Sequence, residues 1–132
     1  MSLIELAGTP AVHNLEVTQG AYFRALLTWK DETGDPIDNS GYTARMQVRR
    51  TVESDDVLVE LATAEDGDAE GDITLGGANG EILLEIAASV TAALPATPFD
   101  RRWRYDLEMV PAGGQVRRLM MGRFVVSPEV TR

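Results

Sequence analysis

The chain has 132 residues and a net charge of -9, with 21 acidic side chains against 12 basic ones. A chain of this length predicts a single domain, which buries roughly two-thirds of its unfolded surface and needs no cross-links to fold. The net charge argues against nucleic acid as the main partner, because binding a polyanion is driven by neutralising its phosphates. The absence of cysteine excludes disulfides, thiolate catalysis and thiolate metal sites.

The first residues predict neither a signal peptide nor a membrane span. They carry no basic segment, and no apolar stretch in the chain approaches about 18 residues. Residues 1–12 are small and weakly patterned, with Gly8 and Pro10, and we expect them to form an N-terminal arm that a neighbouring protein orders. Residues 13–132 are expected to form one β-sandwich domain.

Alternating apolar and polar side chains predict strands through the first half of the domain. A turn is expected at residues 31–36, where Asp, Gly and Pro cluster. The side chains expected to face the core are Leu15 and Val17, then Phe23, Ala25, Leu27 and Trp29, then Tyr42, Ala44, Met46 and Val48, and then Val57, Val59 and Leu61.

Residues 72–94 predict a hairpin followed by a helical turn. Residues 76–80 include three glycines, which tolerate the positive φ that a tight connection requires. After this turn Ile82, Leu84 and Ile86 share one face of a strand. Ser89 is expected to cap a helical turn that runs through Leu94.

The last part of the chain predicts two further strands. Residues 102–109 alternate most strictly, and in residues 115–127 the apolar phase shifts at Gly122, which predicts a β-bulge there. The total of about eight strands, with one short helical turn, indicates an all-β, antiparallel sandwich.

A resemblance to a known family rests on several segments. The run Ile73-Thr74-Leu75-Gly76-Gly77 is followed by Gly-x-Ile-x-Leu-x-Ile over residues 80–86, then by residues 91–95, 105–108 and 126–132. Together with residues 41–49, these resemble a family of short phage and prophage tail proteins, similar in turn to the N-terminal domain of the upper baseplate protein of lactococcal siphophages. The likeness covers roughly the whole chain and implies an immunoglobulin-like topology without a catalytic signature. The chain departs from the family pattern at residues 96–102, so no role is carried over to that loop.

The charges are distributed unevenly along the chain. Residues 51–100 hold 12 acidic side chains and no basic one, whereas residues 101–132 hold seven Arg against three acidic residues. This pattern predicts an electrostatically two-sided molecule, suited to head-to-tail contacts between copies. The alternative is a solvated acidic loop beside a sheet of mixed charge. The interface candidates are Leu3, Ile4 and Glu5 in the arm, and Arg101, Arg102, Arg104, Arg117 and Arg118 on the basic face.

Residues 66–72 resemble the start of a calcium-binding loop. Asp66, Asp68, Glu70 and Asp72 occupy alternate positions, but the twelfth position is Gly77 instead of a bidentate Glu. A solvated loop is therefore the preferred interpretation and calcium the weaker alternative. We expect no cofactor.

Catalytic patterns are missing from the sequence. His13 is the only histidine, and no serine stands in a Gly-x-Ser-x-Gly context. Trp29 and Trp103 lie on the apolar faces of their strands and are expected in the core, whereas Tyr22 is the better surface candidate. The choice of 11 Arg against one Lys slightly favours interface use.

The sequence and the resemblance together predict a non-enzymatic structural or adaptor protein of a tailed-phage or prophage virion. We expect it in the tail or baseplate, assembled in the bacterial cytoplasm. Its expected partners are other tail or baseplate proteins and further copies of itself, with neither nucleic acid nor membrane. The alternatives are a carbohydrate- or receptor-binding module and a head decoration protein.

Overall fold

The computed structural model describes residues 2–7, 10–63, 69–97 and 102–130, and these residues form an all-β fold. The expected all-β class is confirmed, with ten strands in the described segments instead of about eight. The elements are β1 (Ser2–Leu6), β2 (Ala11–Val12), β3 (Leu15–Thr18), β4 (Phe23–Trp29), β5 (Thr43–Arg49), β6 (Val57–Ala62), β7 (Gly71–Leu75), the 3-10 turn η1 (Gly77–Asn79), β8 (Glu81–Ile86), α1 (Ala88–Ala92), β9 (Arg102–Val110) and β10 (Arg117–Ser127).

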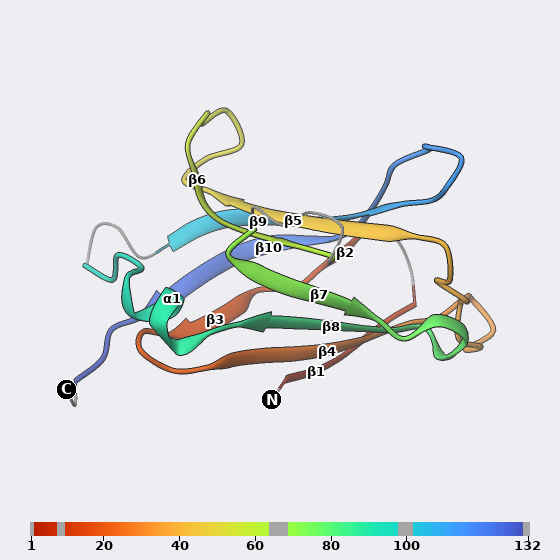
Figure 1. Ribbon diagram of the computed structural model, residues 1–132, viewed down its shortest axis with the longest axis horizontal. Helices are drawn as coiled ribbons and strands as arrows, with labels where there is room; N and C mark the ends of the chain where they lie inside the picture. The colour runs from red at the N-terminus through yellow and green to blue at the C-terminus, as the bar shows by residue number, and fades with distance from the viewer. Residues whose placement is uncertain (1, 8–9, 64–68, 98–101, 131–132) are drawn as a thin grey trace.

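The strands lie in two layers that are joined at one side (Figure 1). One layer has the order β1-β4-β8-β7, and the other has the order β6-β5-β9-β10, with β2 and β3 both along the outer edge of β10. A short pairing of β6 with β7 connects the layers into one path. Ser2, Glu16 and Thr18 line a common surface pocket, so the two ends of this path come close to each other. The sheet is therefore curled and nearly closed, like a barrel.

The expected antiparallel, immunoglobulin-like sandwich is wrong in its strand directions. Four of the nine strand pairings are parallel: β1 with β4, β6 with β7, and β10 with both β2 and β3. The alternation of side chains shows which residues share a face of a strand, but it does not show the direction of the neighbouring strand. The layered arrangement was therefore predictable, and the mixed direction was not.

The segment expected to be an arm contains two of these strands. β1 pairs with β4 from Ser2 opposite Ala25 to Leu6 opposite Trp29, and the Leu6 side chain is fully buried. β2 pairs with β10 in the other layer. Residues 2–6 and 11–12 thus lie at the two edges of the curled sheet.

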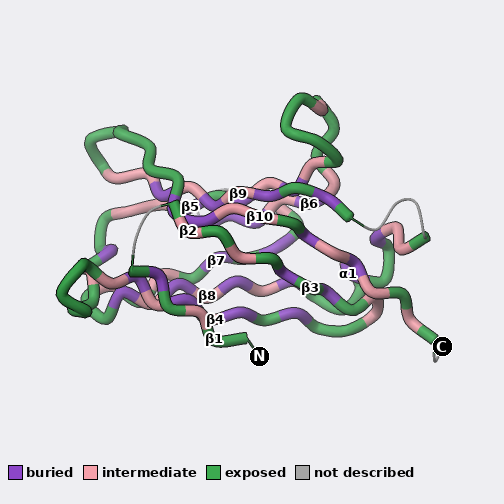
Figure 2. Tube along the Cα trace, turned by 180° about the vertical axis from the view of Figure 1, so that it is seen from behind, coloured by how far each residue is buried: buried purple, intermediate pink, exposed green. Residues whose placement is uncertain are grey.

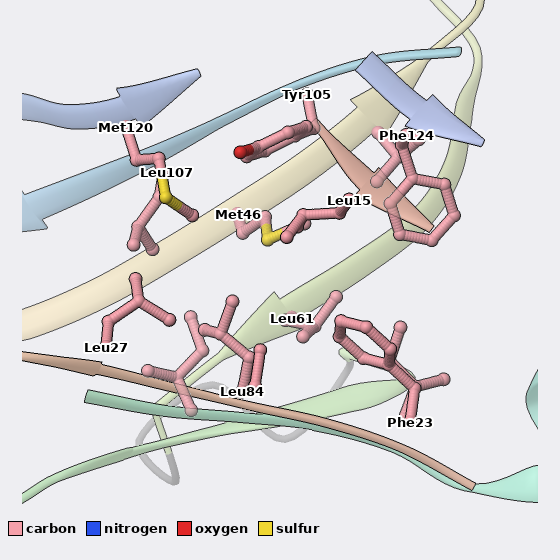
Figure 3. Packing of buried hydrophobic residues seen from close by; sticks show 14 of the residues in the cluster. Leu15, Phe23, Leu27, Met46, Leu61, Leu84, Tyr105, Leu107, Met120 and Phe124 are labelled. Atoms are coloured by element: carbon pink, nitrogen blue, oxygen red, sulfur yellow. The ribbon is translucent and has the colours of Figure 1, made fainter. Parts of the chain in front are cut away.

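The core fills the space between the layers. Figure 3 shows Leu27 and Leu84 from one layer facing Met46 and Leu107 from the other. Along the strands, buried and exposed positions alternate (Figure 2), as expected for a sheet with one face in the core. The predicted inward sets of β4 and β9 are confirmed, including the buried Trp29 and Trp103.

The predicted hairpin is confirmed by β7, η1 and β8. Gly77 and Gly80 have φ values of 78° and 71°, a backbone conformation that favours glycine. The helix that follows is α1, but the expected Ser89 cap is wrong, because the N-cap is Ala87 and makes no side-chain hydrogen bond. Instead, the buried Thr91 hydroxyl donates a hydrogen bond to the Ala21 carbonyl at 2.7 Å and ties the helix to the sheet.

The predicted bulge lies at a different position in β10. The register with β9 shifts between Arg118 and Met120, and Leu119 and Met120 are both buried. Gly122 is needed for another reason: a Cβ at that position would collide with the His13 carbonyl oxygen. The glycine thus lets the backbone between β2 and β3 approach β10 closely.

The His13 carbonyl oxygen also accepts a hydrogen bond from a side chain. The buried Tyr105 hydroxyl donates to the His13 oxygen at 2.6 Å, and burial raises the pKa of Tyr105 above its ordinary value. We expect Tyr105→Phe to lower the free energy of unfolding by about 1 kcal/mol, because it removes one buried hydrogen bond. Urea denaturation measures this change. Tyr22→Phe, at an exposed hydroxyl, should cost clearly less, and equal losses would contradict the role of the Tyr105 contact.

Candidate functional site

Three arginines stand side by side on the outer face of one layer. Arg104 of β9 lies opposite Arg49 of β5 on one side and opposite Arg123 of β10 on the other. Neighbouring strands are about 4.8 Å apart, so the three side chains start close together. Like charges in directly opposite positions destabilise a sheet. We call these three residues the arginine row.

Two members of the arginine row lack a partner within the described residues. Arg49 is half-buried and donates to the Ser54 carbonyl at 2.7 Å and to Gln47 Oε1 at 2.8 Å. Arg104 and Arg123 are exposed, and their side chains make no hydrogen bond, ion pair or ring contact with any described residue. Their charges are therefore available to a binding partner.

A shallow groove of about 660 Å³ lies next to the arginine row on the same face. Its apolar lining includes Val12, which is 67% exposed, Val52, which is 79% exposed, and Met121. Arg49 and Arg104 line it as well, and Glu53 contributes an acidic group. The face thus offers apolar contact area beside free positive charge, which is the usual composition of a protein interface.

The arginines further along this face are balanced by acids. Arg118 Nε lies 3.4 Å from Asp106 Oδ2, and Arg45 Nε lies 2.9 Å from Glu108 Oε1. Burial raises the pKa of Asp106 and the charge of Glu108 acts in the same direction, while Arg118 opposes both. The unbalanced positive charge is therefore concentrated at the Arg104 and Arg123 end of the face.

The structure brings some of the predicted basic residues together and separates others. Arg102 and Arg104 share the outer face of β9, and Arg118 lies on the same side of the layer in its pair with Asp106. Arg117 instead lies over the Trp29 ring, 5.5 Å from its centroid. Arg101 lies outside the described residues.

Of the predicted apolar contact residues, only Leu3 presents a free side chain. Leu3 is 73% exposed on β1, whereas Ile4 is partly buried against the core. Glu5, which was also expected at an interface, forms an ion pair with Lys30 at 3.0 Å.

The arginine row was not predicted from the sequence, although the outward direction of one of its members could have been. Arg123 precedes the inward-facing Phe124, so its outward direction follows from alternation. Its position opposite Arg104 depends on the bulge at Leu119, and the position of Arg49 depends on a pairing between strands far apart in the chain.

The acidic residues of the segment 51–100 do not form one face. Glu53 lines the groove beside the arginine row, and Glu60 accepts a hydrogen bond from Gln47 at 2.5 Å. Asp72 and Glu85 lie opposite each other on β7 and β8, in the other layer. The electrostatic halves expected from the sequence are thus distributed over both layers.

The predicted calcium loop is only partly described. Asp66 and Asp68 lie outside the described residues. The Glu70 carboxylate accepts a hydrogen bond from the Glu60 backbone N–H at 2.7 Å, and Asp72 is exposed on β7. Within residues 2–7, 10–63, 69–97 and 102–130, no group of three or more His, Cys, Asp or Glu side chains is arranged to hold a metal ion.

A second charged feature lies between β4 and β5. Residues 31–38, here called the acidic loop, carry the exposed Asp31, Glu32, Asp35 and Asp38, and none of these forms an ion pair with a described residue. Asp31 Oδ1 accepts hydrogen bonds from the backbone N–H groups of Thr33 and Asp35, both at 3.0 Å. The Thr33 hydroxyl also donates to Asp31 Oδ1, at 2.7 Å. Together these hydrogen bonds lower the pKa of Asp31, and the bond from the Thr33 hydroxyl contributes most. The loop is thus held in shape by its own hydrogen bonds.

This lowered pKa predicts a pH effect on stability. A carboxylate whose pKa is lower in the folded chain than in the unfolded chain stabilises the fold at pH values above its ordinary pKa of 3.8. This contribution is lost as the pH falls through the pKa of the folded chain. We expect Asp31→Asn to lower the melting temperature at pH 6 and to have less effect at pH 2.5. Glu32→Gln, which removes a charge without these hydrogen bonds, is the control. A loss independent of pH would contradict the role of the Asp31 charge.

Comparison with known proteins identifies a shared fold. No family model and no curated protein matches the sequence. The structure resembles the N-terminal domain of phage TP901-1 ORF48, with a TM-score of 0.54 and 13% identity, over 96% of this chain and 97% of that one. The chain has the fold of a phage-protein domain along nearly its whole length. At the level of the fold, this confirms the resemblance expected from the sequence. Among the described helices, none is long and apolar enough to cross a membrane.

Proposed function

We propose that the chain is a non-enzymatic structural or adaptor protein in the virion of a tailed phage or prophage, located in the tail or baseplate. The observation that carries this proposal is the fold shared with the N-terminal domain of phage TP901-1 ORF48, which spans nearly all of both chains.

The surface supports a role in binding. The arginine row and its groove form an open face on rigid strands, where a partner can contact both charge and apolar side chains. The non-enzymatic part of the proposal rests on the sequence, in which cysteine is absent, His13 is the only histidine and no serine stands in a Gly-x-Ser-x-Gly context. Asp106, the described carboxyl with a raised pKa on this face, already has Arg118 as its partner.

The proposal includes partners and a place of assembly. The partners are other tail or baseplate proteins and further copies of the chain, and assembly takes place in the bacterial cytoplasm. Neither nucleic acid nor a membrane is among the proposed partners, since the net charge of -9 disfavours polyanions and the anionic surfaces of membranes.

Purified particles test this proposal. The chain, tagged in its own genome, should appear in multiple copies in phage particles after induction, and in the tail fraction when tails and heads are separated on a density gradient. Quantitative mass spectrometry of the fractions gives the copy number. Absence from purified particles would overturn the virion role, and presence only in the head fraction would move the protein to head decoration.

The carbohydrate-binding alternative requires exposed aromatic side chains, and the described residues offer one. Tyr22 is 54% exposed and hydrogen-bonds to Glu85. Trp29, Trp103 and Tyr105 are buried, and Tyr42 stands edge-on to Trp29. Binding on a glycan array that is lost in Tyr22→Ala would favour this alternative over assembly.

A further inference from the structure

We infer that copies of the chain associate head to tail, with the acidic loop of one copy docked on the arginine row and groove of the next. This inference deepens the proposed function and rests on it, because further copies of the chain are among the partners proposed there. It names the two surfaces and the residues that meet.

The arginine row and the acidic loop are complementary in charge. Arg104 and Arg123 have no anionic partner in the described segments, although the chain has a net charge of -9. The acidic loop has no cationic partner there either. Each set thus provides the charge that the other lacks, and opposite potentials favour encounter and fix the orientation of two surfaces.

The two surfaces lie far apart on one copy. Figure 1 shows the loop that follows β4 at one end of the long axis, and the end of β5 and the start of β9 toward the other. One copy is therefore unable to bring its own acidic loop onto its own arginine row. A symmetric dimer through one surface alone would place like charges together, so each contact joins unlike surfaces, and contacts repeated head to tail produce a ring or a filament.

The backbone of each surface is held in shape before binding. The arginine row lies on paired strands, and the acidic loop is fixed by the hydrogen bonds that Asp31 accepts. The backbones of both surfaces therefore lose little conformational entropy on binding. Pro36 is exposed at the acidic loop and supplies an apolar group for Val12 and Val52 in the groove. Glu53 lines the groove too, and it favours an orientation in which the loop carboxylates lie over Arg104 and Arg123.

Two charge-reversal variants test the contact. In Arg104→Glu/Arg123→Glu the arginine row becomes acidic, and in Glu32→Lys/Asp35→Lys the acidic loop becomes basic. Both variants spare the hydrogen bonds of Asp31 to the backbone of its loop. In sedimentation velocity experiments at low salt, the wild-type chain should self-associate, and each variant alone should associate at least ~100-fold more weakly, because like charges then face each other. An equimolar mixture of the two variants should associate again, since each then offers the surface that the other lacks.

The controls separate this contact from a general charge effect. Arg24→Glu changes the net charge by the same amount as a single Arg104→Glu, but on β4 in the other layer, and should associate like the wild type while Arg104→Glu associates more weakly. Salt should weaken the wild-type association about tenfold between 20 mM and 500 mM NaCl, as expected for an exposed electrostatic contact. Circular dichroism melting establishes that every variant is folded.

Several results would overturn the inference. They are a wild-type chain that stays monomeric at millimolar concentration in low salt, variants that associate like the wild type, and a mixture that fails to recover. An arginine row that instead captures an acidic segment of a different tail protein would also refute the self-contact. In all of these cases the particle experiment decides the virion role separately, so the two proposals fail independently.

Discussion

Replacing Gly122 with alanine is expected to lower the free energy of unfolding by about 2–3 kcal/mol, which is the size of effect seen when a packed site is overfilled. The added Cβ would meet the His13 carbonyl oxygen, a backbone atom that is already fixed. His13 N donates to the Met121 carbonyl at 2.9 Å, and the His13 oxygen accepts from Tyr105. Any displacement that relieves the collision would therefore weaken two hydrogen bonds at the join between β2 and β3.

Gly113→Ala is the matched control for this substitution. Gly113 lies in the turn between β9 and β10, and a Cβ there would meet nothing within 4 Å. Its φ is not positive, so alanine should be tolerated or even stabilise slightly by restricting the unfolded chain. Chemical denaturation of both variants gives the comparison. A Gly122→Ala variant as stable as Gly113→Ala would show that the His13 backbone does not need this space.

Replacing Asn39 with alanine is expected to cost about 2–3 kcal/mol. Asn39 is fully buried, its side-chain amide donates to the Glu81 carbonyl at 3.1 Å, and its Oδ1 accepts from the Gly77 N–H at 2.8 Å. Alanine removes both bonds, each of which contributes about 1 kcal/mol, and it leaves the half-buried Gly77 N–H without this acceptor, which adds to the loss. The segment before β5 would then keep the hydrogen bond from the Asn39 N–H to the Gly77 carbonyl, at 3.1 Å, but lose its side-chain bonds to the β7–β8 hairpin.

The neighbouring Asn79 provides the comparison for Asn39. Its side chain is exposed and bonds to Glu81 within the same turn, so Asn79→Ala should lose less than Asn39→Ala. Hydrogen exchange of the Gly77 amide gives a local measurement, since this proton should exchange faster in Asn39→Ala. Unchanged exchange together with unchanged stability would contradict the proposed attachment.

The faces of the strands could be predicted because alternation is a local property. Phe23, Ala25, Leu27 and Trp29 were expected to face the core, and all four are buried. The β7–β8 hairpin was equally accessible, since its glycines and its strands are adjacent in the sequence. Each of these features depends on residues within a few positions of one another.

Strand direction and long-range register could not be predicted in the same way. The parallel pairing of β1 with β4 leaves no mark in the alternation of either strand. The apolar phase shift comes from the bulge at Leu119, whereas the glycine at position 122 comes from the close approach of His13, and the sequence does not separate these two causes.

The candidate site shows the same limit. The outward direction of Arg104 was predictable, but its position between Arg49 and Arg123 required the register of three strands. The acidic half inferred from the chain order was a property of the sequence and not of the surface, because Glu53 and Glu85 end in different layers.

The pairing of the first strands with distant partners has a consequence for the order in which the chain folds. β3 pairs with β10, so Leu15 finds Phe124 only after nearly the whole described chain is available. Contacts this far apart in sequence are slow to form, because the loop must close before they stabilise anything. During synthesis, β2 and β3 therefore stay unpaired until β10 has left the ribosome. Their exposed backbone is then the part of the growing chain most open to premature pairing with a neighbour.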